Sequence, residues 1–418
     1  MSKLGRDQLS RRQVLQLGGA AAAAGVGWGC NGARGREPVA SDQARREGSG
    51  DAPGGGRDVA HGGARDVVDD RALDEVLDRL HRSEPRVRMG MSSHAPMVAE
   101  ALCAMGHGDR AMAWVDGYDA PVLEVPVPRQ RIDAARWRDA LGPRLDSSSW
   151  ELSLPRWGDW KVFFVEELAG ARWQEVLDRW VARLAPGLGS AATHGVIRTA
   201  HAARALSRRD TPVRRAELAR GLAYWAAAYE ELPARTGVAP APDYRAALAR
   251  LPLYSDRHGR SPGGSFTTGL RLVGRLDGFA AARDLVAAPD DLGAGLSALS
   301  STFARIYVER GAASPVALVH AVTGPCALRR IASHVDPATA RAAFPYAWQA
   351  AAALYCGYAT REAARPGESS LAPAELAGRA VENGNDHAIK FTEALLDENE
   401  LRSDPVYLAA AQDAVSRL

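Results

Sequence analysis

Apolar residues recur at helical spacing along most of the chain from about residue 70 onward. Leu73, Val76 and Leu80 are three or four positions apart, which places them on one face of an α-helix. The same spacing predicts further helices over residues 173–184, 196–206, 214–229, 292–308, 315–331, 338–358 and 373–396. Breaks that contain proline and glycine, such as Pro186-Gly187, separate these segments. The predicted fold class is therefore all-α, with one large multi-helix domain over residues 67–418.

Extended segments are scarce in this pattern. Only residues 122–127 and 161–165 fit short strands, and strand and helix patterns do not alternate as they do around a parallel sheet. No G-x-G-x-x-G motif follows a strand, and no G-x-x-x-x-G-K-[ST] motif occurs. The sequence therefore shows no recognisable site of its own for NADPH or ATP.

The N-terminal segment has the features of an export signal. Arg11 and Arg12 stand shortly before an apolar run from Leu17 to Gly29, which is too short and glycine-rich for a membrane-spanning helix. Residues 1–30 are therefore predicted to be a twin-arginine signal peptide. Recognition by the twin-arginine export machinery would direct the protein to the periplasm or cell envelope.

Two further expectations concern the region around this signal. Cys30 ends the apolar run and is a candidate lipid attachment site, although Gly27-Trp28-Gly29 matches the residues that usually precede a lipoprotein cysteine poorly. Residues 31–66 are rich in Gly, Arg, Asp and Ala and lack hydrophobic periodicity. They are predicted to form a flexible linker.

Composition and charge favour a small molecule as the partner. Apolar residues make up 46% of the chain and charged residues 24%, which are values typical of a globular protein with a sizeable core. The 52 basic and 50 acidic residues are dispersed and leave a net charge of only +2, so no broad field favours nucleic acid. The four cysteines lack C-x-x-C spacing, which excludes a zinc ribbon and a dithiol redox motif.

The ten histidines fall into two groups. Five lie in polar or loop-like surroundings, where we expect solvated side chains: His61, His81, His107, His258 and His334. The other five lie mostly among apolar or small residues on segments far apart in sequence: His94, His194, His201, His320 and His387. A single histidine in such surroundings is usually a satisfied core residue, but five favour a site. Several neutral imidazoles with an oxygen donor suit iron, copper, zinc or manganese, and iron is the first choice for redox work.

Local patterns suggest how some of these histidines are held. Ser93 is a candidate N-cap that places His94 at a helix start. His194 and His201 are seven residues apart on one helix face, about 10 Å from each other, so one is predicted to be a ligand and the other a neighbour. The helix that carries His320 is expected to be interrupted at Thr323-Gly324-Pro325.

His387 and Lys390 are three residues apart and project from one helix face. An alternative is that Lys390 only pairs with Asp386 on an exposed surface. The spacing alone does not choose between these interpretations.

Several of these segments resemble the questin oxidase-like family over most of the chain after about residue 70. They are Ser93 to Leu102, Thr193 to Ala202 with Arg204-Ala205-Leu206, Glu217-Leu218-Ala219 with Leu222 to Trp225, and His320 to Pro325. The family includes fungal enzymes of anthraquinone and aflatoxin-type polyketide pathways, described as performing Baeyer-Villiger-like oxidation or oxidative ring cleavage. One member is known as an iron dioxygenase with four histidines and a carboxylated lysine around the metal.

The resemblance implies roles for particular residues. It implies His94, His194, His320 and His387 as imidazole ligands of Fe(II) and Lys390 as the carboxylated lysine. His201 is the competing fourth histidine and, with Arg198, a candidate catalytic residue. Arg198 is a candidate for orienting a phenolate or carboxylate, and its alternative is a salt bridge between helices.

The implied activity is O2-dependent oxidation of an aromatic or polyketide-like small molecule. Electrons would come from a phenolic substrate, or from NADPH with a separate reductant. The alternatives are an NADPH-dependent Baeyer-Villiger-type monooxygenase, a metal-dependent hydrolase and a non-catalytic envelope binding protein.

The export signal can be tested directly. We expect the double substitution Arg11→Lys with Arg12→Lys to trap unprocessed precursor inside the cell, because the machinery recognises the arginine pair. Fractionation and immunoblotting of the wild type and the variant provide the measurement. Normal export of the variant would contradict the signal assignment.

Overall fold

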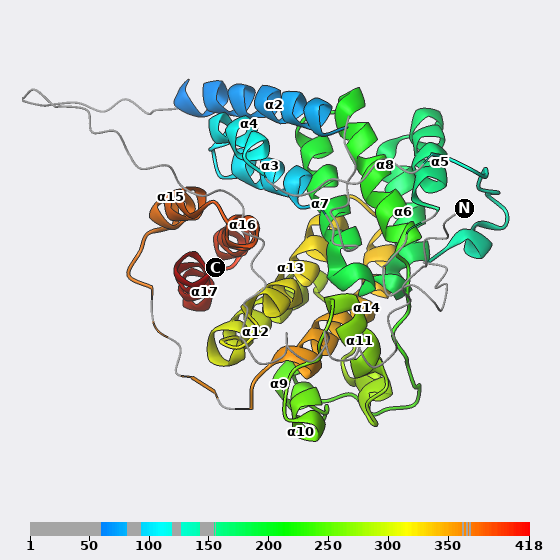
Figure 1. Ribbon diagram of the computed structural model, residues 1–418, viewed down its shortest axis with the longest axis vertical. Helices are drawn as coiled ribbons and strands as arrows, with labels where there is room; N and C mark the ends of the chain where they lie inside the picture. The colour runs from blue at the N-terminus through cyan, green and yellow to red at the C-terminus, as the bar shows by residue number, and fades with distance from the viewer. Residues whose placement is uncertain are drawn as a thin grey trace, which may run out of the picture. The chain divides into compact units, whose positions relative to one another are not determined.

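The computed structural model describes residues 60–81, 93–118, 127–142, 154, 156–361, 363–364, 367 and 369–418. This described part is all-α, as predicted, and contains no strand (Figure 1). Its α-helices are α2 (Ala60–His81), α3 (Ala95–Ala104), α4 (Gly108–Asp116), α5 (Trp157–Gly170), α6 (Trp173–Leu184), α7 (His194–Arg208), α8 (Pro212–Ala227), α9 (Tyr244–Ala249), α10 (Tyr254–His258), α11 (Phe266–Gly274), α12 (Leu292–Arg310), α13 (Pro315–Ala332), α14 (Pro337–Tyr358), α15 (Pro373–Asn383), α16 (Asp386–Leu401) and α17 (Pro405–Arg417). Short 3-10 helices are η3 (Trp137–Ala140), η4 (Ala185–Gly187), η5 (Ser190–Thr193) and η6 (Phe279–Leu285).

Helix α13 forms the centre of the region that matters for function. Its place among the other helices is seen in Figure 1. It packs against α7, α12, α14 and α16, and every residue from Ala317 to Leu328 is buried. A helix that is buried on all sides belongs to a core, not to a surface. Helix α3 in turn packs against α7 and α16. The four helices α3, α7, α13 and α16 therefore form a closed circuit of neighbours.

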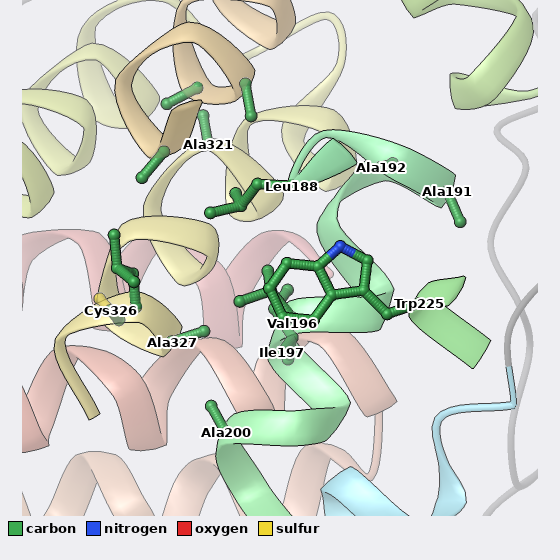
Figure 2. Close-up of a cluster of buried hydrophobic side chains, with 14 of the residues drawn as sticks. Leu188, Ala191, Ala192, Val196, Ile197, Ala200, Trp225, Ala321, Cys326 and Ala327 are labelled. Atoms are coloured by element: carbon green, nitrogen blue, oxygen red, sulfur yellow. The ribbon is translucent and has the colours of Figure 1, made fainter. Parts of the chain in front are cut away.

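The contact between α7 and α8 is close because a glycine faces a tryptophan. A Cβ atom on Gly195 would lie 2.7 Å from Cβ of Trp225 and 2.8 Å from its Cα. Trp225 is fully buried, and its indole Nε1 donates to the carbonyl of Gly187 at 3.1 Å. Figure 2 shows the indole ring beside Val196, below the turn that leads into α7. This packing fixes the first turn of α7, where His194 lies.

The expected break in the His320 helix is wrong. Helix α13 runs from Pro315 to Ala332 and contains Pro325 in its interior. An internal proline removes one backbone hydrogen bond and disfavours a helix. Here the surrounding helices bury the whole segment, and tertiary packing commonly overrides local propensity.

Other boundaries also differ from the expectations. Residues 161–165 are not extended, because they lie in α5, where Trp157, Trp160 and Phe164 are buried at helical spacing. The helix expected over 373–396 is two helices, because Gly384 adopts φ 73° after α15 and Asn385 caps α16. Helix α2 begins at Ala60, inside the range expected to be a linker, even though Gly62 and Gly63 disfavour a helix.

Some expectations concern residues outside the described part. These are the signal peptide with Arg11, Arg12 and Cys30, the linker as far as residue 59, and most of the extended segment 122–127. Among the described helices, none combines the length and the apolar character that crossing a membrane requires.

A pair of glycine substitutions tests the α7 contact. We expect Gly195→Ala to lower the free energy of unfolding by about 1–3 kcal/mol, because the new methyl group meets Trp225 and overpacks the core. Gly378→Ala is the matched control, since it lies in α15 with no atom within 4 Å of the added Cβ. That change should instead raise stability by about 0.5–1 kcal/mol. Urea unfolding measures both, and a Gly195→Ala protein as stable as the wild type would contradict the packing.

Candidate metal centre

Four histidine rings, three from helices and one from the residue directly before α3, meet in the interior of the circuit. His94 directly precedes α3, His194 opens α7, His320 lies within α13 and His387 lies in the first turn of α16. All four are buried. Their neighbouring ring centroids are 4.9 Å apart for His94 and His194, 4.6 Å for His94 and His387, 4.4 Å for His194 and His320, and 5.4 Å for His320 and His387. The structure therefore brings together the four histidines that were expected to form a group.

A buried carboxylate orients His94. Oδ2 of Asp386 accepts a hydrogen bond from Nδ1 of His94 at 2.6 Å, and Oδ1 lies 2.7 Å from Nδ1 of His387. Burial opposes ionisation of this carboxyl group, but the neighbouring His387 and His94 hold its pKa well below the usual value. Ser93, the expected N-cap, does not cap α3; His94 itself takes that position without a side-chain cap bond. The Asp386 contact, not helix capping, therefore sets the ring of His94.

A strained turn orients His194. Ala191, Ala192 and Thr193 have φ values of 47°, 53° and 68°, in the left-handed region that costs an L-residue about 1–2 kcal/mol each. The turn directs the carbonyl of Ala191 back to the ring, where it accepts a hydrogen bond from Nδ1 of His194 at 2.6 Å. Gly324 of α13 gives the turn room, because a Cβ there would lie 3.1 Å from Cγ2 of Thr193.

Lys390 belongs to the same cluster. It lies one turn after His387 on α16 and is 4% exposed, while Asp386 is 3% exposed. The alternative of an exposed Asp386–Lys390 pair is therefore wrong.

Both nitrogens of His320 are buried without a hydrogen-bond partner in the described part of the chain. Polar atoms buried in this way usually indicate a missing water, ion or ligand.

Three of the imidazoles, those of His94, His194 and His320, are held in their neutral form. Burial, followed by the charge of Lys390, lowers the pKa of His94 from its usual 6.5 to about 3. Burial is also the main reason why the pKa values of His194 and His320 lie well below the usual value, and Lys390 contributes to both. Neutral imidazole is the form that ligates metals.

The tautomers of two rings make the cluster suitable for a cation. The carbonyl of Ala191 and the ionised Asp386 can only accept hydrogen bonds, so Nδ1 carries the proton in both His194 and His94. Each Nε2 therefore presents a lone pair, and these two atoms lie 2.7 Å apart. Two facing lone pairs repel each other unless a cation lies between or beside them. This donor set fits a transition metal, with Nδ1 of each ring bound to an acceptor as metal-ligating histidines usually are.

Asp386 is itself an alternative ligand. One donor atom each from His94, Asp386 and His387 lie within 4.8 Å of one another, so these three residues alone form a candidate metal group. We favour an outer role for Asp386 because Oδ2 accepts a hydrogen bond from Nδ1 of His94; Oδ1 lies 2.7 Å from Nδ1 of His387 but has no hydrogen-bond partner in the described part of the chain. The sequence analysis missed this role. Its only signal was the position of Asp386 directly before a candidate ligand.

His201 and Arg198 lie outside the ring cluster. Nδ1 of His201 bonds to Oε2 of Glu100 at 2.7 Å. Arg198 donates to Glu217 through Nε at 2.6 Å and Nη2 at 2.9 Å, which is the interhelical salt bridge that was its alternative interpretation. Of the two candidates on α7, His194 is therefore the residue that joins the cluster.

An aromatic side chain that the sequence analysis missed borders the site. The ring centroid of Phe266 in α11 lies 6.1 Å from that of His320, and Tyr358 packs edge-on against Phe266 at 5.3 Å. Helix α11 lies beside η5 and α14. One side of the histidine cluster is therefore apolar and aromatic.

No model of a known protein family matches the chain, and no curated protein is significantly similar to it. The resemblance to the questin oxidase-like family therefore stays a prediction that rests on the segments quoted above.

The buried imidazoles predict a pH dependence of stability in the metal-free protein. The unfolded chain binds a proton at His94 near pH 6.5, whereas the folded chain does so near pH 3, so acid favours unfolding between these values. Each imidazole that stays neutral should cost about 1.4 kcal/mol per pH unit below 6.5. Urea unfolding at pH 7, 6 and 5 after chelation measures this slope.

His94→Gln should reduce that slope, and His258→Gln, at an exposed position, should leave it unchanged. An unfolding free energy that is constant between pH 7 and pH 5 would contradict the burial of neutral imidazoles.

Proposed function

We propose that the protein is an O2-dependent oxidoreductase that acts on an aromatic or polyketide-like small molecule. In this proposal His94, His194, His320 and His387 hold iron, together with a carboxylated Lys390. The observation that carries it is the 2.7 Å approach of two Nε2 atoms that both lack a proton, inside a cluster of four buried imidazoles. The resemblance to the questin oxidase-like family supports the choice of substrate class.

The donor set favours a transition metal of the iron type. Calcium and magnesium prefer oxygen ligands, and a structural zinc site is usually closed by cysteine thiolates or a small tetrahedral set. A set of four imidazoles with one anionic oxygen suits a redox metal better. When bound, iron would supply the capacity to bind O2 and to exchange electrons with it.

Lys390 can supply the anionic oxygen. A buried ammonium group is costly, which favours the neutral amine that reacts with CO2. The amine Nζ forms a bond to the carbon of CO2 and releases a proton, leaving a carbamate. Imidazole is not an anionic ligand, so this carbamate would give the site its only anionic ligand if Asp386 stays in its outer role.

The remaining residues orient and shield the site. Asp386 and the Ala191 carbonyl hold two rings in one tautomer, so that Nε2 stays available as a donor atom. Phe266 keeps one side apolar, which suits a flat aromatic molecule and excludes water. The lack of a nucleotide motif favours electrons from an electron-rich substrate over NADPH.

A metal-dependent hydrolase is the second candidate. A cavity with room for about one water molecule lies beside His320 and Lys390, where a metal would activate water. Oxygen consumption with a phenolic substrate distinguishes the two functions, because a hydrolase consumes none. Stoichiometric binding without turnover would instead favour a binding protein.

We expect protein purified from iron-replete medium to contain about one transition metal per chain. Lys390→Ala should abolish oxygen uptake and weaken metal retention while the helices remain folded, because it removes the anionic ligand and leaves the buried Ile389, Phe391 and Leu395 of α16 in place. His387→Ala should do the same. His258→Gln is the control and should retain full metal content and activity.

Elemental analysis, an oxygen electrode and circular dichroism provide the measurements. A wild-type protein that neither contains nor is stabilised by a transition metal would refute the metal centre. Full activity and metal content in Lys390→Ala would refute the carbamate but leave the histidine ligands in place.

A further inference from the structure

The cavity beside the metal centre has an unusual wall. Three of its polar lining residues are His201, Arg330 and Lys390, and His320 and Thr323 complete the polar part. The remaining lining residues are apolar: Ile197, Val319, Ala327 and Ala394. No carboxylate lines the cavity, and its size admits about one water molecule, or one hydroxyl oxygen. An imidazole and one guanidinium group, those of His201 and Arg330, therefore face one small space next to the candidate ligands His320 and Lys390.

His201 is prepared to act as a base in this cavity. Oε2 of Glu100 lies 2.7 Å from its Nδ1. Burial opposes ionisation of Glu100, but Arg204 and His201 hold its pKa well below the usual value, so the carboxylate can only accept a hydrogen bond. Nδ1 of His201 therefore carries the proton, and Nε2 has a lone pair.

The charges around His201 keep the ring neutral at neutral pH. Burial is the largest effect and lowers the pKa of His201, and Arg330 of α13 acts in the same direction. Glu100, which lies in α3, and Glu393 of α16 raise it in part. Lys390 and His320 share the cavity wall. The ring is thus available to accept a proton, and Glu100 would stabilise the imidazolium that forms.

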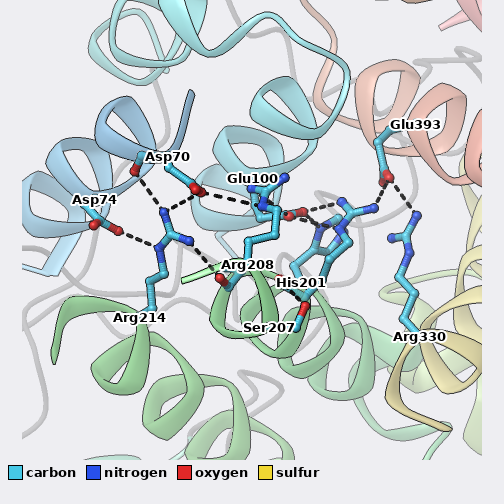
Figure 3. A network of polar contacts seen from close by, with 11 residues as sticks. Asp70, Asp74, Glu100, His201, Ser207, Arg208, Arg214, Arg330 and Glu393 are labelled. Carbon is cyan, nitrogen blue, oxygen red and sulfur yellow. Dashed lines mark hydrogen bonds and ion pairs between the residues drawn. The ribbon is translucent and has the colours of Figure 1, made fainter. Parts of the chain in front are cut away.

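An ion-pair network fixes His201 and Arg330 relative to each other. Arg204 donates through Nε to Oε1 of Glu100 at 2.9 Å and also bonds to Glu393. Arg330 donates to the same Glu393 at 2.7 Å (Figure 3). Glu100, Arg204 and Glu393 thus connect His201 to Arg330 through hydrogen bonds and ion pairs, and both end residues line the cavity. Both side chains are therefore held on the cavity wall by the same buried charges.

We propose that His201 is a catalytic base for a substrate hydroxyl group, a step that rests on the proposed function. Nε2 takes the proton as the O–H bond breaks and an N–H bond forms, and Arg330 stabilises the oxyanion left behind. The substrate class is therefore a phenol or enol whose hydroxyl group reaches the cavity. No oxidant or reductant takes part in this transfer.

The proton has an exit on the other side of the ring. His201 also lines a second water-sized cavity with Glu100, Arg198 and Glu217. Glu217 lies 3.1 Å from Nε2 of His81, whose side chain is 14% exposed. Glu100, Glu217 and His81 would therefore relay a proton from Nδ1 of His201 toward solvent; the ring must also exchange tautomers before Nε2 can act as a base again.

The first experiment uses 4-nitrophenol, whose visible absorption reports its ionisation, with the metal-containing protein in the absence of O2. When the probe is bound to the wild type, its pKa should lie at least one unit below its pKa in free solution. In His201→Gln the ionisation constant of the bound probe should be at least tenfold smaller than in the wild type. His258→Gln should match the wild type.

The second experiment measures the pH profile of kcat/KM for a phenolic substrate. Loss of the base should lower kcat/KM about 100-fold or more at pH 7, and the variant should recover as rising pH ionises the phenol without help. Metal content should stay equal to that of the wild type, because His201 lies outside the ring cluster. A purely structural role would instead lower metal content and activity equally at every pH.

The outcomes separate this inference from the proposed function. A probe that binds the wild type as the phenolate, in a protein without oxygen uptake, supports the base and refutes the oxidase. A probe that does not bind, or that binds as the neutral phenol, overturns the base, and this measurement needs no variant. Oxygen uptake with an unchanged pH profile in His201→Gln overturns the base and leaves the oxidase standing.

Discussion

The Nε2 atoms of His94 and His194 lie 2.7 Å apart, and each presents a lone pair because Nδ1 of the same ring donates to an acceptor. In the low dielectric of a protein interior such a contact is unfavourable, and an unpartnered His320 beside it adds a further cost. A bound cation removes both penalties. The circuit of α3, α7, α13 and α16 therefore fits the proposed cation site, because α7, α13 and α16 each carry one ring and His94 directly precedes α3.

Holding the rings in place carries a conformational cost of its own. Three successive left-handed residues precede His194, and their combined strain is several kcal/mol. The surrounding structure offsets it: the turn is buried, Trp225 packs against Gly195 behind it, and the Ala191 carbonyl closes onto the ring. Backbone strain that the surrounding structure maintains in this way is typical of functional sites, where it helps to hold one group in position.

Local patterns in the sequence predicted most of the helices but few of the side-chain contacts between them. Helix α6 matches its predicted range because its apolar spacing is local information. The prediction of a helix break at Pro325 was wrong, because the burial that stabilises α13 comes from helices far away in sequence. The buried setting of His94 and His320 was readable from their apolar surroundings. Asp386 was not, because its partner His94 is 292 residues away, and only the folded chain shows that its carboxylate is buried.

Two histidines in this region share one arrangement and differ in what they face. Asp386 accepts from Nδ1 of His94 at 2.6 Å, and Glu100 accepts from Nδ1 of His201 at 2.7 Å, so both rings have the same tautomer, with the lone pair on Nε2. The Nε2 atom of His94 meets a second imidazole lone pair, which is an environment for a metal. The ring of His201 instead lines a water-sized cavity with Arg330 and Lys390. In the proposed step, its Nε2 atom takes a proton from a hydroxyl group there. A carboxylate behind an imidazole therefore does not decide its role, because the group in front of the opposite nitrogen does.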